Sequence, residues 1–234
     1  TAINLAAKNL PDETISLVHE ILNTKGRIIF CGMGKSGFVA RKLAATFSSM
    51  GTPSAFLHPS EALHGDLGMM QPKDLFIALS KSGSGPELEQ IIPILNSSKN
   101  KTCLICCNKG VLSSLSSLTI CLPFDKEACP INLAPTSSST LMMAFGDAVA
   151  ITVSKAIGFN KNSFAKNHPS GSLGKRLTLK VKSLMSPKKN LPLISPGTKF
   201  KDLILTITSK KLGIGIIVDD HRKLLGIITD GDLR

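Results

Sequence analysis

The sequence has 234 residues, of which 42% are hydrophobic, and its mean hydropathy of +0.18 is typical of a globular chain with one large or two modest domains. Its longest apolar runs are too short to cross a bilayer and no cleavable leader pattern is visible, so we expect a cytoplasmic protein without membrane contact. The net charge of +12 is spread over the whole chain and Trp and Tyr are absent, which favours a basic surface that attracts anionic metabolites over a nucleic-acid partner.

The first three quarters of the chain alternate between short apolar runs and helix-like segments. Residues 1–24 show a helical pattern that Pro11 interrupts. The alternation that follows predicts βαβ units, and hence an α/β doubly wound parallel sheet flanked by helices on both faces. Strands are expected at 27–31, 54–57, 74–80, 102–107 and 118–123, and helices at 36–50, from 86, briefly after 107, and at 140–157.

The composition changes at residues 179–198, which contain three prolines and a lysine pair. This stretch predicts a linker, followed by a helix at 200–210 and two apolar runs, 212–218 and 224–229, that a turn separates. We therefore predict two domains, residues 1–178 and 179–234. Because the second is small for an independent core, we expect it to pack against a partner copy or the first domain.

The first glycine loop, GMGKSG at residues 32–37, follows an expected strand and opens an expected helix. A P-loop would need glycine at Ile29, so that pattern is absent. A dinucleotide-binding loop would need an acid at the end of the next strand, where the sequence has His58. The open alternatives are a plain strand-to-helix turn and an anion-binding turn built from Gly34, Lys35 and Ser36.

A second loop, SKSGSGPELEQ at residues 80–90, also follows a strand and opens a helix. Ser80, Ser82 and Ser84 offer hydroxyl groups suited to a phosphomonoester, although such loops are also ordinary polar helix caps. Two such loops after neighbouring parallel strands would converge on one crevice. The pair therefore indicates a phosphate-bearing ligand.

These loops, together with HPSEALHGDLGM, KEACPINLAPTSSST, FGDAVA and NHPSGSLGKRL, resemble a sugar isomerase (SIS) domain of the D-arabinose 5-phosphate isomerase family. The ending GIITDGDLR is similar to the first of the paired CBS motifs that follow the SIS domain in that family, and the second is missing here. The resemblance covers nearly the whole chain. It implies interconversion of D-ribulose 5-phosphate and D-arabinose 5-phosphate for Kdo and lipopolysaccharide biosynthesis, without a redox cofactor.

The resemblance implies catalytic roles for Lys35, Glu87, Glu127 and His168. Lys35 would stabilise an anionic oxygen, of phosphate or of the enediolate. Either Glu87 or Glu127 would be the base that moves a proton between C1 and C2, and His168 would open the sugar ring or shuttle a proton. A Lys and two Glu are otherwise most often surface charges, and a His before Pro is most often a turn residue.

Further site residues follow from the same resemblance. His64 is expected to contact sugar hydroxyls, and His58 matches a position that carries an inhibitory or incidental zinc ion in relatives. Two histidines without a third close ligand are also typical of ordinary polar residues. Substrate contacts are expected from Thr136 and Ser137 at the start of the last helix and from Gly51 and Thr52, with helix capping as the alternative for each.

The resemblance also bears on partners and on rival functions. It implies a homotetramer with sites at subunit interfaces, so that His168 acts on the neighbouring chain's substrate, and a nucleotide at Thr229 and Asp232 of the CBS part. Ser84 departs from the family, which usually has Glu there, so local phosphate or metal contacts are in doubt. The alternatives are a non-catalytic sugar-phosphate regulator and an isomerase acting on an amino sugar phosphate.

Overall fold

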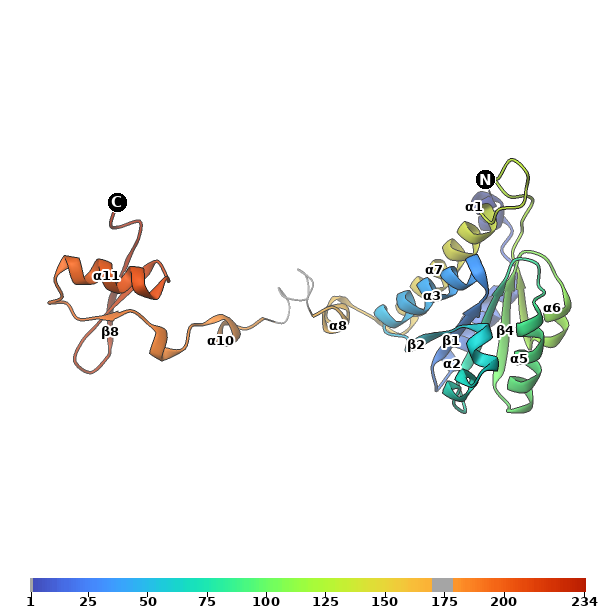
Figure 1. Ribbon diagram of the computed structural model, residues 1–234, viewed down its shortest axis with the longest axis horizontal. Coiled ribbons are helices and arrows are strands. Elements are labelled where there is room, and N and C mark those ends of the chain that lie inside the picture. Colours follow the sequence, from blue (N-terminus) through green and yellow to red (C-terminus); the bar gives the residue numbers. More distant parts are fainter. Residues whose placement is uncertain (1, 170–178) are drawn as a thin grey trace. The chain divides into compact units, whose positions relative to one another are not determined.

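The computed structural model describes residues 2–169 and 179–234. It divides into two compact units, Thr1–Thr178 and Leu179–Arg234, and each is described by itself (Figure 1). The end of the first expected domain, and residues 170–177 of the NHPSGSLGKRL motif, lie outside the described residues.

The first unit is built on a parallel sheet in the order β2-β1-β3-β4-β5. Because β2 pairs with one side of β1 and β3 with the other, the chain reverses its winding direction between β1 and β3. This order confirms the predicted doubly wound sheet, and the reversal marks where such folds bind ligands. The strands are β1 Ile28–Gly32, β2 Ser54–Leu57, β3 Leu75–Ser80, β4 Lys101–Cys106 and β5 Leu118–Cys121.

Helices cover both faces of this sheet (Figure 1). Successive side chains of a strand point to opposite faces, so Ile28 and Phe30 join one hydrophobic core cluster while Ile29 and Cys31 join the other. One face is covered by α1 Ala2–Lys8, α2 Glu13–Asn23, α3 Gly34–Ser49 and α7 Ser137–Ala156. The other is covered by α4 Pro59–Leu63, η1 Asp66–Met69, α5 Pro86–Ser97 and α6 Val111–Leu115.

The expected interruption of the first segment at Pro11, which lacks an amide hydrogen, is confirmed, because two helices flank it. Other helices differ from the expected ones. The last helix of the sheet domain begins at Ser137 rather than Thr140. A further helix, α8 Lys161–Asn167, was not predicted; Asn160 caps it by accepting hydrogen bonds from the amides of Asn162 and Ser163.

No single helix in the described ranges is long and apolar enough to span a bilayer. Helices α7 and α8 satisfy such a test only when taken together, across a bend of 117°. In the fold, α7 buries Leu141, Phe145 and Val149 against the sheet domain core.

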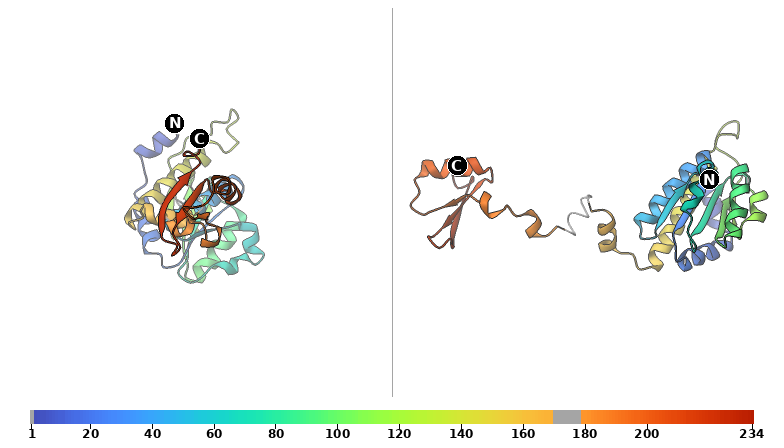
Figure 2. Two further views of the ribbon diagram at one scale, coloured as in Figure 1. Left: turned by 90° about the vertical axis from the view of Figure 1, so that its left-hand side faces the viewer. Right: turned by 60° about the horizontal axis from the view of Figure 1, so that its bottom comes forward.

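The second unit is a small sheet in the order β6-β7-β8, with α11 packed on it (Figure 2). The pairing is parallel between β6 and β7 and antiparallel between β7 and β8. Its core cluster has Ile194, Leu203 and Ile207 as its fully buried members. Its elements are α10 Val181–Leu184, η2 Lys188–Asn190, β6 Leu193–Ile194, α11 Phe200–Lys210, β7 Ile214–Val218 and β8 Leu224–Thr229.

Candidate functional site

The two predicted loops lie at the carboxyl ends of the central strands. β1 ends at Gly32 and α3 begins at Gly34, while β3 ends at Ser80 and α5 begins at Pro86. Because β1 and β3 are hydrogen-bonded neighbours, both loops and both helix N-termini face the crevice at the reversal point. The structure thus brings the two loops together, as the sequence predicted.

Glycine in the first loop has two separate physical reasons. Gly34 has φ +56, a conformation that L side chains rarely adopt, although a Cβ there would meet no atom. A Cβ on Gly37 would lie 2.5 Å from the carbonyl oxygen of Gly32, so glycine is needed for the close approach of α3 to β1. Lys35 and Ser36 lie in the first turn of α3, where backbone amides have no partner within the helix. Lys35 is exposed, with its Nζ 5.8 Å from the centre of the Phe38 ring.

The hydroxyls of the second loop are engaged within the loop itself. Ser80 Oγ donates to the carbonyl of Ser84 at 2.9 Å, and Ser82 Oγ donates to the same oxygen at 3.3 Å. Ser84 itself is exposed. The serine side chains therefore shape the turn, and the amides at the start of α5 are the groups directed at a ligand.

Glu87 lies in the first turn of α5 and is half-buried. Within the described part of the chain its carboxylate forms no hydrogen bond or ion pair, whereas that of Glu89 accepts a hydrogen bond from the Gly85 amide at 3.1 Å. A carboxylate placed beside the crevice and not engaged by the protein is free to take a proton from a ligand.

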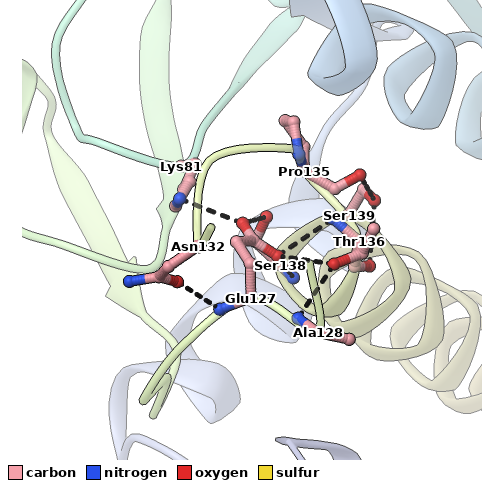
Figure 3. Close-up of polar contacts among 8 residues, drawn as sticks. All are labelled: Lys81, Glu127, Ala128, Asn132, Pro135, Thr136, Ser138 and Ser139. Atoms are coloured by element: carbon pink, nitrogen blue, oxygen red, sulfur yellow. Dashed lines mark hydrogen bonds and ion pairs between the residues drawn. The ribbon is translucent and has the colours of Figure 1, made fainter. Parts of the chain in front are cut away.

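Glu127 is in the opposite situation, with its side chain completely buried beneath the start of α7 (Figure 3). One carboxylate oxygen accepts bonds from the amides of Thr136, at 2.9 Å, and Ser138, at 3.1 Å. The other accepts a 2.5 Å bond from Ser138 Oγ and lies 3.0 Å from Lys81 Nζ. Glu127 therefore satisfies amides at the N-terminus of α7, which explains why this helix begins earlier than predicted.

These contacts determine the acidity of Glu127. Burial is the largest single effect and raises the pKa of the carboxyl, but the hydrogen bonds from Ser138 and Thr136 and the Lys81 ammonium together outweigh it. The net result lowers the pKa of Glu127 to about 2. Such a weak base is poorly matched to proton transfer near neutral pH.

Three residues of this network were missed by the sequence reasoning. Lys81, Ser138 and Asn132 all contact Glu127, Asn132 through its side-chain oxygen, which accepts a 2.7 Å bond from the Glu127 amide (Figure 3). Lys81 could have been singled out from the sequence, because it is a lone cation directly after the strand that leads into the serine loop. Thr136 was predicted to contact substrate, yet its hydroxyl is engaged with Glu127 at 3.2 Å and with the Ala128 amide. Ser137 is half-buried at the first position of α7.

His168, Gly51 and Thr52 are not brought to this crevice within one chain. Gly51 and Thr52 precede β2, at the amino ends of parallel strands, and a Cβ on Gly51 would meet Phe159 at 2.7 Å. His168 ends α8, beside Asn167, which donates to the carbonyl of Ser49 at the end of α3. Lys35 is at the other end of this 16-residue helix, and a rise of 1.5 Å per residue separates the two ends by roughly 20 Å. Within one chain these three residues therefore lie far from Lys35, and their contribution to a site stays a prediction.

The two histidines of the HPSEALHGD run flank α4 at the carboxyl end of β2. His58 precedes the helix and His64 follows it, exposed. The Nδ1 atom of His58 is buried with no hydrogen-bond partner among the described residues. In the same part of the chain, no group of three His, Cys, Asp or Glu side chains is close enough to hold a metal ion. The residues present thus do not fit a complete zinc site within one chain.

In the second unit, Thr229 and Asp232 contact one another. A carboxylate oxygen of Asp232 accepts bonds from the amide and the hydroxyl of Thr229, both at 2.8 Å. Hydrogen bonds from the Thr229 amide and hydroxyl lower the pKa of Asp232. The two residues form a turn after β8 with the carboxylate already ordered.

Comparison with known proteins identifies the class to which this fold and site belong. The SIS domain family matches residues 21–152, and the CBS domain family matches residues 181–234. The chain therefore belongs to the SIS domain family. Within it, the chain groups with the arabinose 5-phosphate isomerases, as the sequence resemblance predicted.

Two relatives and two solved structures give the extent of the similarity. The arabinose 5-phosphate isomerase KdsD of Francisella tularensis is 44% identical over 97% of this chain and 71% of its own length. The KdsD of Yersinia pestis is 43% identical over 92% of this chain, which spans 66% of that relative's length. The structure of Escherichia coli CFT073 c3406 in complex with arabinose 5-phosphate has a TM-score of 0.70 and 37% identity, covering 72% of this chain and 90% of that one. The Vibrio vulnificus protein NanR, at 18% identity and a TM-score of 0.62, shares the fold.

Proposed function

We propose that the protein is an aldose-ketose isomerase that interconverts D-ribulose 5-phosphate and D-arabinose 5-phosphate, the step that supplies Kdo and lipopolysaccharide biosynthesis. The observation that carries the proposal is that the loops opening α3 and α5, which carry Lys35 and Glu87, follow hydrogen-bonded neighbouring strands, and that the Glu87 carboxylate has no partner among the described residues. The names of the KdsD relatives and the arabinose 5-phosphate bound to the E. coli neighbour support the substrate.

The chemistry assigns a role to each group in the crevice. The amides at the starts of α3 and α5 bind the phosphate, because unpaired amides and the helix dipoles favour an anion. Glu87 moves the proton between C1 and C2, and Lys35 stabilises the negative oxygen of the enediolate. The Glu127 carboxylate is already engaged by Thr136, Ser138 and Lys81, so we assign it to holding the start of α7. The interconversion moves hydrogen within one molecule, so no redox cofactor is required.

We infer that a second copy of the chain completes the site. His168, Gly51 and Thr52 lie at the far end of α3 from Lys35, so they reach a substrate only in a neighbouring subunit. A homotetramer in the cytoplasm is the assembly that we propose. The test mixes two inactive variants, Lys35→Ala and His168→Ala, during co-expression. Shared sites would restore part of the activity in mixed oligomers, whereas sites contained in one chain would leave the mixture as inactive as its components.

Two accessory properties form part of the proposal. Turnover needs no metal, and zinc near His58, where one chain offers no complete site among its described residues, is inhibitory or incidental, so a chelator is expected to leave the rate unchanged or raise it. The CBS unit binds a nucleotide, with Thr229 and Asp232 at its ribose. A shift in the unfolding temperature on adding an adenine nucleotide, lost in Asp232→Ala, is the expected result. A chelator that abolishes turnover would overturn the first statement, and an unchanged unfolding temperature the second.

The direct assay incubates the protein with D-ribulose 5-phosphate and measures D-arabinose 5-phosphate. Turnover is expected, with glucosamine 6-phosphate and related amino sugar phosphates left unchanged. Tight binding of the pentose phosphate without turnover would instead identify a regulator, the function of some proteins that share this fold. Turnover of the amino sugar alone would identify another isomerase of the family.

A further inference from the structure

Lys81 connects the serine loop to the buried carboxylate beneath α7. It directly follows β3 and lies beside Ser80 and Ser82 in the loop proposed to bind phosphate. Its Nζ is 3.0 Å from Glu127 and 5.4 Å from the centre of the Phe124 ring, and its side chain is 31% exposed. The ammonium is thus held between an aromatic ring and a carboxylate of the segment that leads into α7.

The surroundings of Glu127 leave Lys81 with a distinct task. The other groups that donate to the Glu127 carboxylate, from Thr136 and Ser138, are neutral and belong to the same segment and the helix it enters. In the described ranges, the titratable groups nearby are Cys107 directly after β4 and, along the chain, the exposed Asp125 and Lys126 and the half-buried Cys129. Among the described residues, Lys81 is the cation that forms an ion pair with this carboxylate.

The same lysine also anchors its own loop. The carbonyl oxygen of Lys81 accepts hydrogen bonds from the backbone amides of Cys107, at 3.1 Å, and Asn108, at 3.0 Å. Both residues directly follow β4. The backbone of Lys81 is thereby bonded to the residues after β4, while its side chain contacts Glu127. A displacement of Glu127 would consequently be transmitted to the loop that carries Ser80, Ser82 and the start of α5.

We propose that Lys81 is a positioning residue of the isomerase site, which through its ion pair with Glu127 holds the start of α7 against the phosphate-binding serine loop. The role in catalysis rests on the proposed function, but the coupling between Lys81 and Glu127 does not. No proton or electron is transferred in this role. Lys81 acts through the geometry and charge of Glu127, and Glu87 remains the group that meets the substrate.

The test is a double-mutant cycle in the full chain with Lys81→Met, Glu127→Gln and both together, and with Lys81→Arg as the conservative variant. The urea midpoint is followed from neutral pH down to about pH 3 and needs no substrate. Losing an opposite charge raises the pKa of a carboxyl by about 1–3 units. In Lys81→Met the urea midpoint at neutral pH should therefore be lower. The acid-side loss, whose onset is set by the unfolded-state pKa, should be smaller and should end at a higher pH than in the native chain. In the Glu127→Gln background Lys81→Met should leave the pH profile unchanged, because the group that it would shift is gone.

The catalytic readout is the KM for the pentose phosphate, because Lys81 is proposed to position the phosphate-binding loop. In Lys81→Met it should rise by up to on the order of 10²-fold, while Lys81→Arg restores the original value. If Lys81→Met alone fails to fold, recovery of folding in the double variant supports the coupling and failure in both contradicts it. Equal destabilisation at every pH and in both backgrounds would overturn the proposal. A protein that shows the stability coupling but no isomerase activity would refute the proposed function and leave the ion pair's role intact.

Discussion

Glu87 and Glu127 show how the same side chain takes different roles at one edge of a sheet. Glu87 lies in the first turn of α5 and Glu127 precedes α7, and both match motif positions of one enzyme family. Glu87 is half-buried and has no partner among the described residues, whereas the Glu127 side chain is completely buried and held by Ser138, Thr136 and Lys81. The difference shows that a motif locates a carboxylate, but the donors around it decide whether it accepts a proton or holds a helix in place.

The largest expected effect comes from removing the free carboxylate. Glu87→Gln should lower kcat by about 10²–10⁴-fold, the usual effect of removing a general base. The urea midpoint should stay nearly unchanged, because the carboxylate has no hydrogen bond or ion pair to lose in the described part of the chain. Steady-state kinetics on D-ribulose 5-phosphate measure the first quantity. Glu89→Gln, in the same helix turn, is the matched control and should retain most of the activity. Near-normal turnover in Glu87→Gln would contradict Glu87 as the base and favour Glu127, the other predicted carboxylate.

The second largest effect is a loss of stability when a donor to the buried Glu127 carboxylate is removed. The shortest of these hydrogen bonds is the 2.5 Å bond from Ser138 Oγ. Ser138→Ala should reduce the free energy of unfolding by about 1.5–3 kcal/mol, because hydrogen bonds to charged groups are worth that much. Urea unfolding measures this loss. Ser137→Ala is the matched control one residue earlier, and its change should stay within about 0.5 kcal/mol. Equal losses in the two variants would mean that the Glu127 bond contributes nothing specific.

The third effect is the pH dependence that Glu127 gives to stability. Its folded-state pKa is lowered from 4.5 to about 2. The stabilisation is therefore fully present above the unfolded value and is lost as the pH falls through the folded one, with about 1–3 kcal/mol at stake. Urea midpoints measured over that acid range should fall in the native chain and change less in Glu127→Gln. Parallel profiles for the two proteins would contradict the low pKa.

Much of this fold could be predicted because its information is local. Five strands, the doubly wound order and both glycine loops follow from runs of apolar residues and from glycines with a steric purpose, such as Gly37. The site was predictable as two loops meeting at one crevice. The network around Glu127 was not, because it depends on Lys81 from another loop and on the hydroxyl of Ser138, and no periodicity encodes such a contact. The position of His168 likewise depends on α8, an element with no apolar pattern.

The smallest expected effect comes from an ion pair outside the site, and it defines what makes the Lys81 pair different. Lys101 and Glu20 are 2.6 Å apart, but their side chains are 65% and 30% exposed. Lys101→Met should change the free energy of unfolding by only about 0.2–1 kcal/mol, because water solvates both charges when the pair is broken. Added salt should reduce even that value, since exposed charges are screened within about 10 Å at ordinary ionic strength.

The contribution of Lys81 to the free energy of unfolding should resist salt, because the Glu127 carboxylate has no exposed surface at which ions or water could replace the ammonium. Urea midpoints of both lysine variants at low and high salt measure the contrast. A Lys81 contribution that fades with salt as that of Lys101 does would place Glu127 in contact with solvent and remove the reason for its low pKa.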